Sequence, residues 1–186
     1  MNRVHRVYCR SRHWRRHLQR VLGPATDGLA LREASVLELG SGPGLTTDWL
    51  LPRVAQLTCV DIDADDAAAL AARLPKARVV HADATSLPFA PMTFDVVLSF
   101  TMLHHLPDSA AQTRLFAEAR RVLRPGGVFA GIDSVRGVLF ALAHVGDTMT
   151  LIPPEDFPER LRRAGLERPT VSKHGDHVRF RAWAPA

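Results

Sequence analysis

The stretch Val36-Leu-Glu-Leu-Gly-Ser-Gly-Pro-Gly-Leu-Thr-Thr-Asp48 places three glycines at alternate positions directly after a short apolar run. Glycine adopts left-handed backbone angles freely and carries no Cβ, so its backbone N–H group can lie close to a ligand. The apolar run is typical of a buried strand, and a helical pattern begins at Leu45. A helix that starts behind such a turn directs its positive end at the ligand. This strand, turn and helix therefore predict a ligand site at the end of the first strand.

Short apolar runs alternate with helical patterns along most of the chain. We expect strands over residues 36–39, 57–60, 77–81, 94–100 and 128–132, and helices over 45–53, 65–74 and 109–123. Strands separated by helices at this spacing favour a doubly wound parallel α/β sheet with helices on both faces. A helix over 155–164 follows, and then runs 169–173 and 178–183 flank His174-Gly-Asp-His177, which predicts an antiparallel hairpin. The expected fold is a Rossmann-like, mostly parallel seven-stranded sheet that ends in this hairpin.

Composition and length limit the kinds of protein that the sequence can encode. A chain of 186 residues with 46% hydrophobic content fits a single domain over 1–186. No apolar run reaches the ~20 residues of a membrane span, and no secretory signal is visible at the N-terminus. The two cysteines, Cys9 and Cys59, form neither a disulfide framework nor a metal-binding spacing. We therefore expect a cytoplasmic protein with no metal site, in which Cys59 is a small buried side chain.

The positive charge of the chain is concentrated at its N-terminus. Residues 1–20 hold seven arginines and no acid, which leaves 17 basic and 19 acidic residues in the other 166. A basic arm could bind the phosphates of RNA. However, Ser11 can cap a helix whose Trp14, Leu18 and Val21 share one face and which Gly23-Pro24 would close. We therefore expect a docked amphipathic helix within an N-terminal helical segment, 1–30, rather than a nucleic-acid site.

Three features favour a ligand that is a nucleoside carrying an amino acid. Asp61 ends the second expected strand, 21 residues after Gly40, where a carboxylate usually accepts the ribose hydroxyls. A dinucleotide site would continue as Gly-x-Gly-x-x-Gly, but Leu45 stands where the third glycine should be. Glu38 beside the turn would repel a diphosphate and attract an ammonium group. The pattern favours S-adenosylmethionine over a nicotinamide cofactor, although a nicotinamide oxidoreductase stays the alternative.

Seven motifs, in order along the chain, resemble those of the class I S-adenosylmethionine-dependent methyltransferases, and most closely their small-molecule branch. They are Val36-Leu-Glu-Leu-Gly-Ser-Gly-Pro-Gly44, Val60-Asp-Ile-Asp63, His81-Ala-Asp-Ala84, Leu87-Pro-Phe89, Phe94-Asp-Val-Val97, Leu103-His-His-Leu106 and Val122-Leu-Arg-Pro-Gly-Gly127. The resemblance is strong over residues 36–133 and weaker over 153–184. It implies that S-adenosylmethionine is the cofactor and S-adenosylhomocysteine the product.

The resemblance also implies roles for single residues. Gly40, Ser41 and Gly42 would wrap the methionyl moiety, with Glu38 near its ammonium group. Asp61 would hold the ribose hydroxyls. Contacts to the adenine would come from Ile62, Asp83 and Ala84, and contacts to the methionyl end from Ser99, Phe100 and Thr101.

The acceptor side is less determined by the sequence. His104 and His105 follow the fourth expected strand, so that one of them can act as a base or both can order the loop by packing; of the two, His104 is expected nearer the acceptor. The apolar segment 134–152 would form a lid over an apolar or aromatic acceptor with one polar handle, unless it packs as core. Candidate acceptor contacts are Tyr8, Cys9, Trp14, His144 and Asp147.

The sequence therefore predicts methyl transfer from S-adenosylmethionine to a small acceptor. An RNA methyltransferase would use the arginine-rich arm, but no Asn/Asp-Pro-Pro-Tyr motif follows Leu98. A partner protein that binds the cofactor without catalysis would need a blocked acceptor pocket. The oligomeric state is not indicated.

Overall fold

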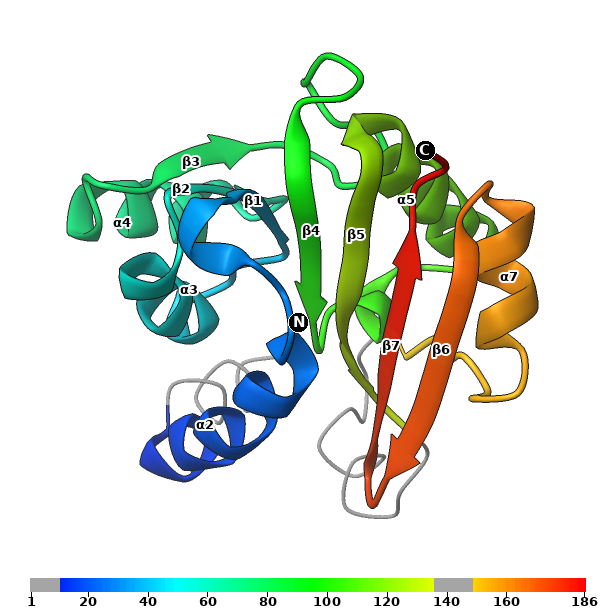
Figure 1. Cartoon of the computed structure of the whole chain (residues 1–186). Helices are drawn as coiled ribbons and strands as arrows, with labels where there is room; N and C mark the ends of the chain where they lie inside the picture. The colour runs from blue at the N-terminus through cyan, green and yellow to red at the C-terminus, as the bar shows by residue number, and fades with distance from the viewer. Residues whose placement is uncertain (1–10, 136–148) are drawn as a thin grey trace.

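A computed structural model describes residues 11–135 and 149–186 of the chain, which form one seven-stranded sheet with helices on both faces (Figure 1). The strand order across the sheet is β3-β2-β1-β4-β5-β7-β6. The strands are β1 (Ser35–Leu39), β2 (Gln56–Asp61), β3 (Arg78–His81), β4 (Phe94–Phe100), β5 (Leu123–Ser134), β6 (Glu167–His174) and β7 (His177–Trp183). The fold class predicted from the sequence is confirmed.

The central strand β1 determines where a ligand can bind. It pairs in parallel with β2 on one side and with β4 on the other, so the chain first builds the sheet outward through β2 and β3 and then returns to add β4 and β5. In open α/β sheets of this kind, ligands bind beyond the carboxyl ends of the strands at the point where the order reverses. Here that point lies between β1 and β4.

The C-terminal hairpin is the antiparallel part of the sheet. β7 lies between β5 and β6 and runs antiparallel to both. The two-residue turn Gly175-Asp176 joins β6 to β7, and Gly175 has a φ of 61°. The predicted hairpin around His174-Gly-Asp-His177 is thus confirmed.

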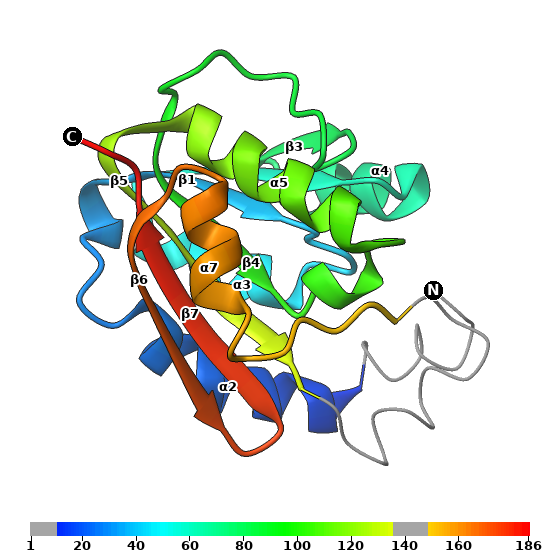
Figure 2. The same cartoon turned by 90° about the vertical axis from the view of Figure 1, so that its right-hand side faces the viewer.

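Two hydrophobic cores cover the two faces of the sheet because successive strand residues point to opposite sides. In β1, Val36 belongs to one core, and Leu37 and Leu39 belong to the other. Figure 2 shows α5 (Ser109–Val122) and α7 (Phe157–Arg163) together on one face, with α2 (Arg12–Thr26) and α3 (Leu45–Leu50) across the sheet from them. The core beneath α2 and α3 also receives Leu70 of α4 (Ala64–Arg73).

Helix α2 has the amphipathic character expected from the sequence. The Ser11 hydroxyl accepts a hydrogen bond from the Trp14 N–H group at 3.1 Å and caps the helix. Leu18, Leu22 and Ala25 are buried against the sheet, while the arginines of the helix are exposed; these are Arg12, Arg15, Arg16 and Arg20. The docked helix is therefore confirmed.

The end of α2 differs from the prediction. The helix does not stop at Gly23-Pro24 but includes Pro24 and continues to Thr26. Pro24 has no N–H group to donate to the Arg20 carbonyl, so one helical hydrogen bond is lost, whereas the Thr26 hydroxyl donates to the Leu22 carbonyl at 2.9 Å. The gain from burying Ala25 and Thr26 favours the longer helix.

Other element boundaries shift by a few residues. The helix expected over 45–53 ends at Leu50 and continues as the 3-10 turn η2 (Leu51–Arg53), because Pro52 interrupts it. β5 begins at Leu123 instead of Val128, since Leu123 already pairs with Phe94 across an irregular register. Within the described ranges, no helix has the length and apolar character needed to cross a bilayer.

Candidate functional site

A cavity of about 440 Å³ lies at the carboxyl ends of the strands around the β1–β4 switch point. Nine of the eleven residues predicted to bind the cofactor line it: Gly40, Ser41, Gly42, Asp61, Ile62, Asp83, Ala84, Phe100 and Thr101. The two exceptions, Glu38 and Ser99, are buried beneath it. The carboxyl ends of the four strands β1, β2, β3 and β4 thus contribute to a single hollow.

The glycine turn lines the cavity. Its three positions require glycine for different physical reasons. A Cβ on Gly40 would lie 2.2 Å from Met102 Cγ, and one on Gly44 would lie 2.4 Å from Leu70 Cδ1, so these positions are small because of packing. A Cβ on Gly42 would meet no protein atom within 4 Å. The neighbouring Ser41 hydroxyl is buried and has no hydrogen-bond partner in the described part of the chain. Gly42 and Ser41 therefore face the space that a ligand would occupy.

Asp61 ties the glycine turn to the end of β2. Its Oδ2 accepts a hydrogen bond from the Gly42 N–H group at 2.6 Å, and its Oδ1 accepts one from the Asp63 N–H group at 2.9 Å. Burial raises the pKa of the Asp61 carboxyl, and the two backbone hydrogen bonds partly oppose this rise. Each oxygen keeps a second lone pair, so the carboxylate can still accept hydroxyl donors from the cavity.

The far side of the cavity carries an exposed apolar side chain and a polar turn. Ile62 is 69% exposed and lines the cavity, so its aliphatic side chain offers an open apolar surface there. The Asp83 Oδ1 accepts from the Thr85 N–H group at 2.8 Å, so its turn is ordered. Ala84, between Asp83 and Thr85 in the turn, is buried.

Glu38 is buried near the end of β1. Its carboxylate points beneath the turn, where the hydroxyls of Thr46 and Thr47 at the start of α3 donate to its two oxygens. The Cys59 thiol donates to the same carboxylate at 3.4 Å. Burial raises the pKa of Glu38 and of the Cys59 thiol. The carboxylate thus joins β1 to α3, and the prediction that Glu38 lies near the ligand's ammonium group stays a prediction.

The end of β4 forms the wall opposite Asp61. Ser99 is fully buried within the sheet, whereas Phe100 and Thr101 line the cavity. Thr101 has a φ of 53°, and its N–H group donates to the Ile132 carbonyl at 2.8 Å. This left-handed residue turns the chain out of the strand and brings Met102 over Gly40.

The two histidines occupy the reverse of their expected places. His104 is 2% exposed, and its Nδ1 donates to Asp133 Oδ1 at 2.5 Å; His105 lines the cavity. The Asp133 carboxylate also accepts from the Leu103 N–H group at 2.7 Å, so it holds the loop and the His104 ring together. His105, not His104, is therefore the histidine next to the cavity.

A comparison with protein families agrees with this geometry. The family model described as "Methyltransferase domain" matches residues 37–131, which is half of the chain. The chain belongs to the class I S-adenosylmethionine-dependent methyltransferases. Its cofactor is accordingly S-adenosylmethionine.

Relatives of this methyltransferase resemble it over different shares of its length. A probable S-adenosylmethionine-dependent methyltransferase of Mycolicibacterium smegmatis is 36% identical over 94 residues, which cover 50% of this chain and 35% of the relative. A chloroplastic 2-methyl-6-phytyl-1,4-hydroquinone methyltransferase of Oryza sativa is 30% identical over 169 residues, or 88% of this chain and 47% of the relative. The chain thus spans between a third and a half of these relatives.

A crystal structure of a Pyrococcus horikoshii protein has the same fold. Its TM-score is 0.80 at 18% identity, and the match covers 96% of this chain and 94% of that one. At this identity the likeness concerns the fold alone.

The residues of the cavity fit S-adenosylmethionine. The buried Ser41 hydroxyl needs a partner, the space above Gly42 is open, and the volume lies in the ordinary range for small-ligand sites. Asp61 and Ile62 both line the cavity, and their contacts with the ribose and the adenine stay predictions. Since Glu38 is engaged with α3, the acids that line the methyltransferase cavity are Asp61, Asp63, Asp66 and Asp83.

The N-terminal helix contributes a wall that was only partly expected. Trp14 lines the cavity, as predicted, together with Leu18 of the same helix. Tyr8, Cys9, His144 and Asp147 lie outside the described residues. Of the predicted lid 134–152, both described ends are anchored in the core through Val135 and Ile152.

Several lining residues were missed from the sequence. They include Leu18, Thr85, Met102, Leu106, Pro107 and Arg114. Met102 and Thr85 directly follow predicted site residues, so their positions gave a signal. Arg114 lies inside α5, where an exposed arginine has no distinguishing pattern.

Proposed function

We propose that this chain transfers the methyl group of S-adenosylmethionine to a small, largely apolar or aromatic acceptor. The observation that carries the proposal is that one cavity contains both the cofactor-side residues and an apolar wall with a histidine. Gly42 and Asp61 lie on the cofactor side, and Phe100, Leu106 and His105 lie on the other. The methyl donor and the acceptor can therefore lie next to each other within one cavity.

The chemistry needs little from the protein besides alignment. The bound cofactor supplies a methyl group that a sulfonium already activates. The residues of the chain hold the acceptor in line with that methyl group and keep water out, which lowers the entropic part of the barrier. Trp14, Leu18 and Met102 supply apolar surface for this purpose.

His105 supplies the polar group of the acceptor wall. An acceptor with a hydroxyl must lose its proton, and a histidine in the cavity can take it. His104 cannot do so directly, because its ring is buried and paired with Asp133. We assign His104 to ordering the loop that presents His105, whose ring lies 4.1 Å from it between centroids.

Aromatic acceptors have additional support from a relative. The Oryza sativa protein is named for a hydroquinone that carries a phytyl chain, and its similarity to this chain covers 88% of it. An aromatic ring with hydroxyls and an apolar chain matches a cavity lined by Trp14, Phe100 and Leu106 around one histidine.

Transfer of labelled methyl groups tests the proposal. The purified chain is incubated with methyl-labelled S-adenosylmethionine and with phenols and hydroquinones, with and without an apolar side chain, and in parallel with RNA. We expect label in the apolar-chain aromatics and none in RNA, with Asp61→Ala, which should incorporate far less label at a limiting cofactor concentration, as the control. Label in RNA alone would contradict the acceptor class, and failure to bind S-adenosylhomocysteine would contradict the cofactor site.

Two of the alternatives from the sequence, the RNA methyltransferase and the nicotinamide oxidoreductase, gain no support. The arginines of α2 lie on a solvated helix face, and the comparisons give no sign of a nicotinamide enzyme. The cytoplasmic location, the single-domain organisation and the lid role of 134–152 stay predictions.

A further inference from the structure

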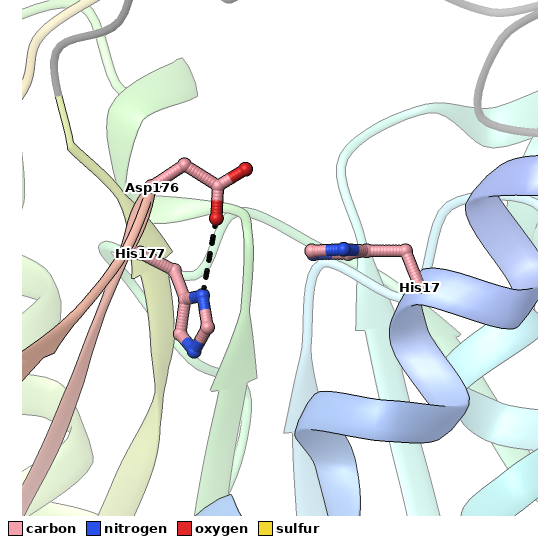
Figure 3. A group of neighbouring side chains, drawn as sticks. All are labelled: His17, Asp176 and His177. Carbon is pink, nitrogen blue, oxygen red and sulfur yellow. Dashed lines mark hydrogen bonds and ion pairs between the residues drawn. The ribbon is translucent and has the colours of Figure 1, made fainter.

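The turn between β6 and β7 brings metal-binding side chains next to the N-terminal helix. β7 runs antiparallel to β5, so its first residue, His177, pairs with Ser134 at the carboxyl end of β5. This is the same end of the sheet as the cavity. Asp176 precedes it in the turn, and its carbonyl accepts from the Val135 N–H group at 3.0 Å. His17 of α2 points toward both from the opposite side (Figure 3).

We propose that His17, Asp176 and His177 form a site for a divalent transition-metal ion such as Zn²⁺. Among residues 11–135 and 149–186, these three offer ligand atoms that all lie within 4.8 Å of one another. Two imidazole nitrogens and one carboxylate oxygen are a ligand set that suits Zn²⁺ and its neighbours better than Mg²⁺ or Ca²⁺, which prefer oxygen. From the sequence no metal site is expected, since the cysteines lack a metal-binding spacing and His17 lies far along the chain from Asp176 and His177.

The distances agree with a small closure of the site. Ligand atoms about 2.1 Å from a tetrahedral Zn²⁺ lie about 3.4 Å from one another. The Asp176 Oδ1 and His177 Nδ1 atoms are already 3.3 Å apart. All the ligand atoms lie within 4.8 Å of one another, so no separation needs to shrink by more than roughly 1.4 Å, which side-chain rotation of His17 and Asp176 can supply.

The proposed site is accessible to an ion from solvent. Its three ligands also leave one coordination position open. The Asp176 side chain is 78% exposed and that of His177 is 15% exposed, so solvent reaches the group from the side of the turn. The nearest cation along β7, Arg179, has its guanidinium engaged with the His174 ring and the Pro24 carbonyl. Three protein ligands leave a fourth tetrahedral position for water.

Such an ion would connect the hairpin to the wall of the cavity. The rings of His17 and Trp14 are stacked, with centroids 5.0 Å apart and planes 14° apart, and Trp14 lines the cavity. A metal bound to His17 would fix this stack and join α2 to the end of the sheet. The site is a clamp on the N-terminal helix, and its existence does not depend on the proposed methyl transfer.

Zinc binding by the tag-free full-length chain tests the proposal. Calorimetry with ZnSO₄ in a non-chelating buffer should give one tight site per chain and a higher melting temperature. Loss of an outer-shell partner alone typically weakens metal binding 10- to 100-fold. We therefore expect His17→Gln and His177→Gln to weaken it by more than ~100-fold and Asp176→Asn by more than ~10-fold.

Controls separate this site from other histidines. His81→Gln alters an exposed histidine at the opposite edge of the sheet, on β3, and should keep the zinc affinity of the wild type. Zinc should also change the tryptophan fluorescence of the wild type, and Trp14→Phe should remove that change. Since Asp176 is an exposed turn residue, Asp176→Asn will fold even if a histidine variant does not. Absence of stoichiometric binding, or equal affinity in Asp176→Asn and the wild type, would show that Asp176 and His177 form only an ion pair.

Discussion

Replacing Asp61 by alanine should weaken cofactor binding far more than it weakens the fold. The carboxylate accepts backbone hydrogen bonds from Gly42 and Asp63 at 2.6 and 2.9 Å, and each oxygen has one lone pair left for a ribose hydroxyl. Hydrogen bonds to a charged group contribute about 1.5–3 kcal/mol each. Allowing for the water that replaces the carboxylate, loss of both ribose bonds should cost ~2–3 kcal/mol, or roughly 30- to 150-fold in Kd.

Calorimetric titration with S-adenosylhomocysteine measures this loss directly. The variant also loses the two backbone hydrogen bonds, so its thermal unfolding should be recorded first and the titration run well below its transition. Asp65→Ala is the matched control, because Asp65 is an exposed acid in the first turn of α4 and does not line the cavity. A cooperatively folded Asp61→Ala protein that binds within threefold of the wild type would refute the reasoning.

Three further predictions concern the turn, the histidines and the buried acid. Gly42→Ala should abolish S-adenosylhomocysteine binding and lower the free energy of unfolding by ~1–2 kcal/mol, because the residue has a left-handed φ. Gly40→Ala should destabilise the protein more, because its Cβ would collide with Met102. Equal binding by both variants would contradict this prediction. His105→Asn should lower the rate of methyl transfer without changing S-adenosylhomocysteine affinity. His104→Asn should lower the melting temperature, because Asp133 loses its hydrogen-bond partner. A stable and fully active His105→Asn protein would refute a role of His105 in methyl transfer. Burial raises the pKa of Glu38, so the folded state holds this proton more tightly than the unfolded chain and the free energy of unfolding falls as the pH rises above 4.5. Denaturant titrations of Glu38→Gln between pH 4.5 and 8 should therefore show a smaller fall than the wild type, and parallel curves would count against it.

The order of strands and helices is readable from the sequence because it depends on local patterns. Apolar runs such as 94–100 must be buried on both faces, and only a sheet covered by helices on both sides does this. The ligand end of the sheet follows in the same way, since Gly42 and Asp61 lie at strand ends that the chain order brings together. Even the docked helix was visible, because its apolar residues recur at helical spacing.

The direction of single side chains was decided by tertiary structure. The sequence places an acid before the turn and two histidines after β4, but whether Glu38 points to the ligand depends on Thr46 and Thr47 being opposite it. Asp133, which comes from β5, turns His104 inward and leaves His105 at the cavity. His17 and His177 meet only because β7 inserts antiparallel beside β5 and α2 packs across its end. A pattern along the chain records how far apart residues are in sequence, whereas hydrogen-bond partners and ligand sets depend on which elements pack against each other.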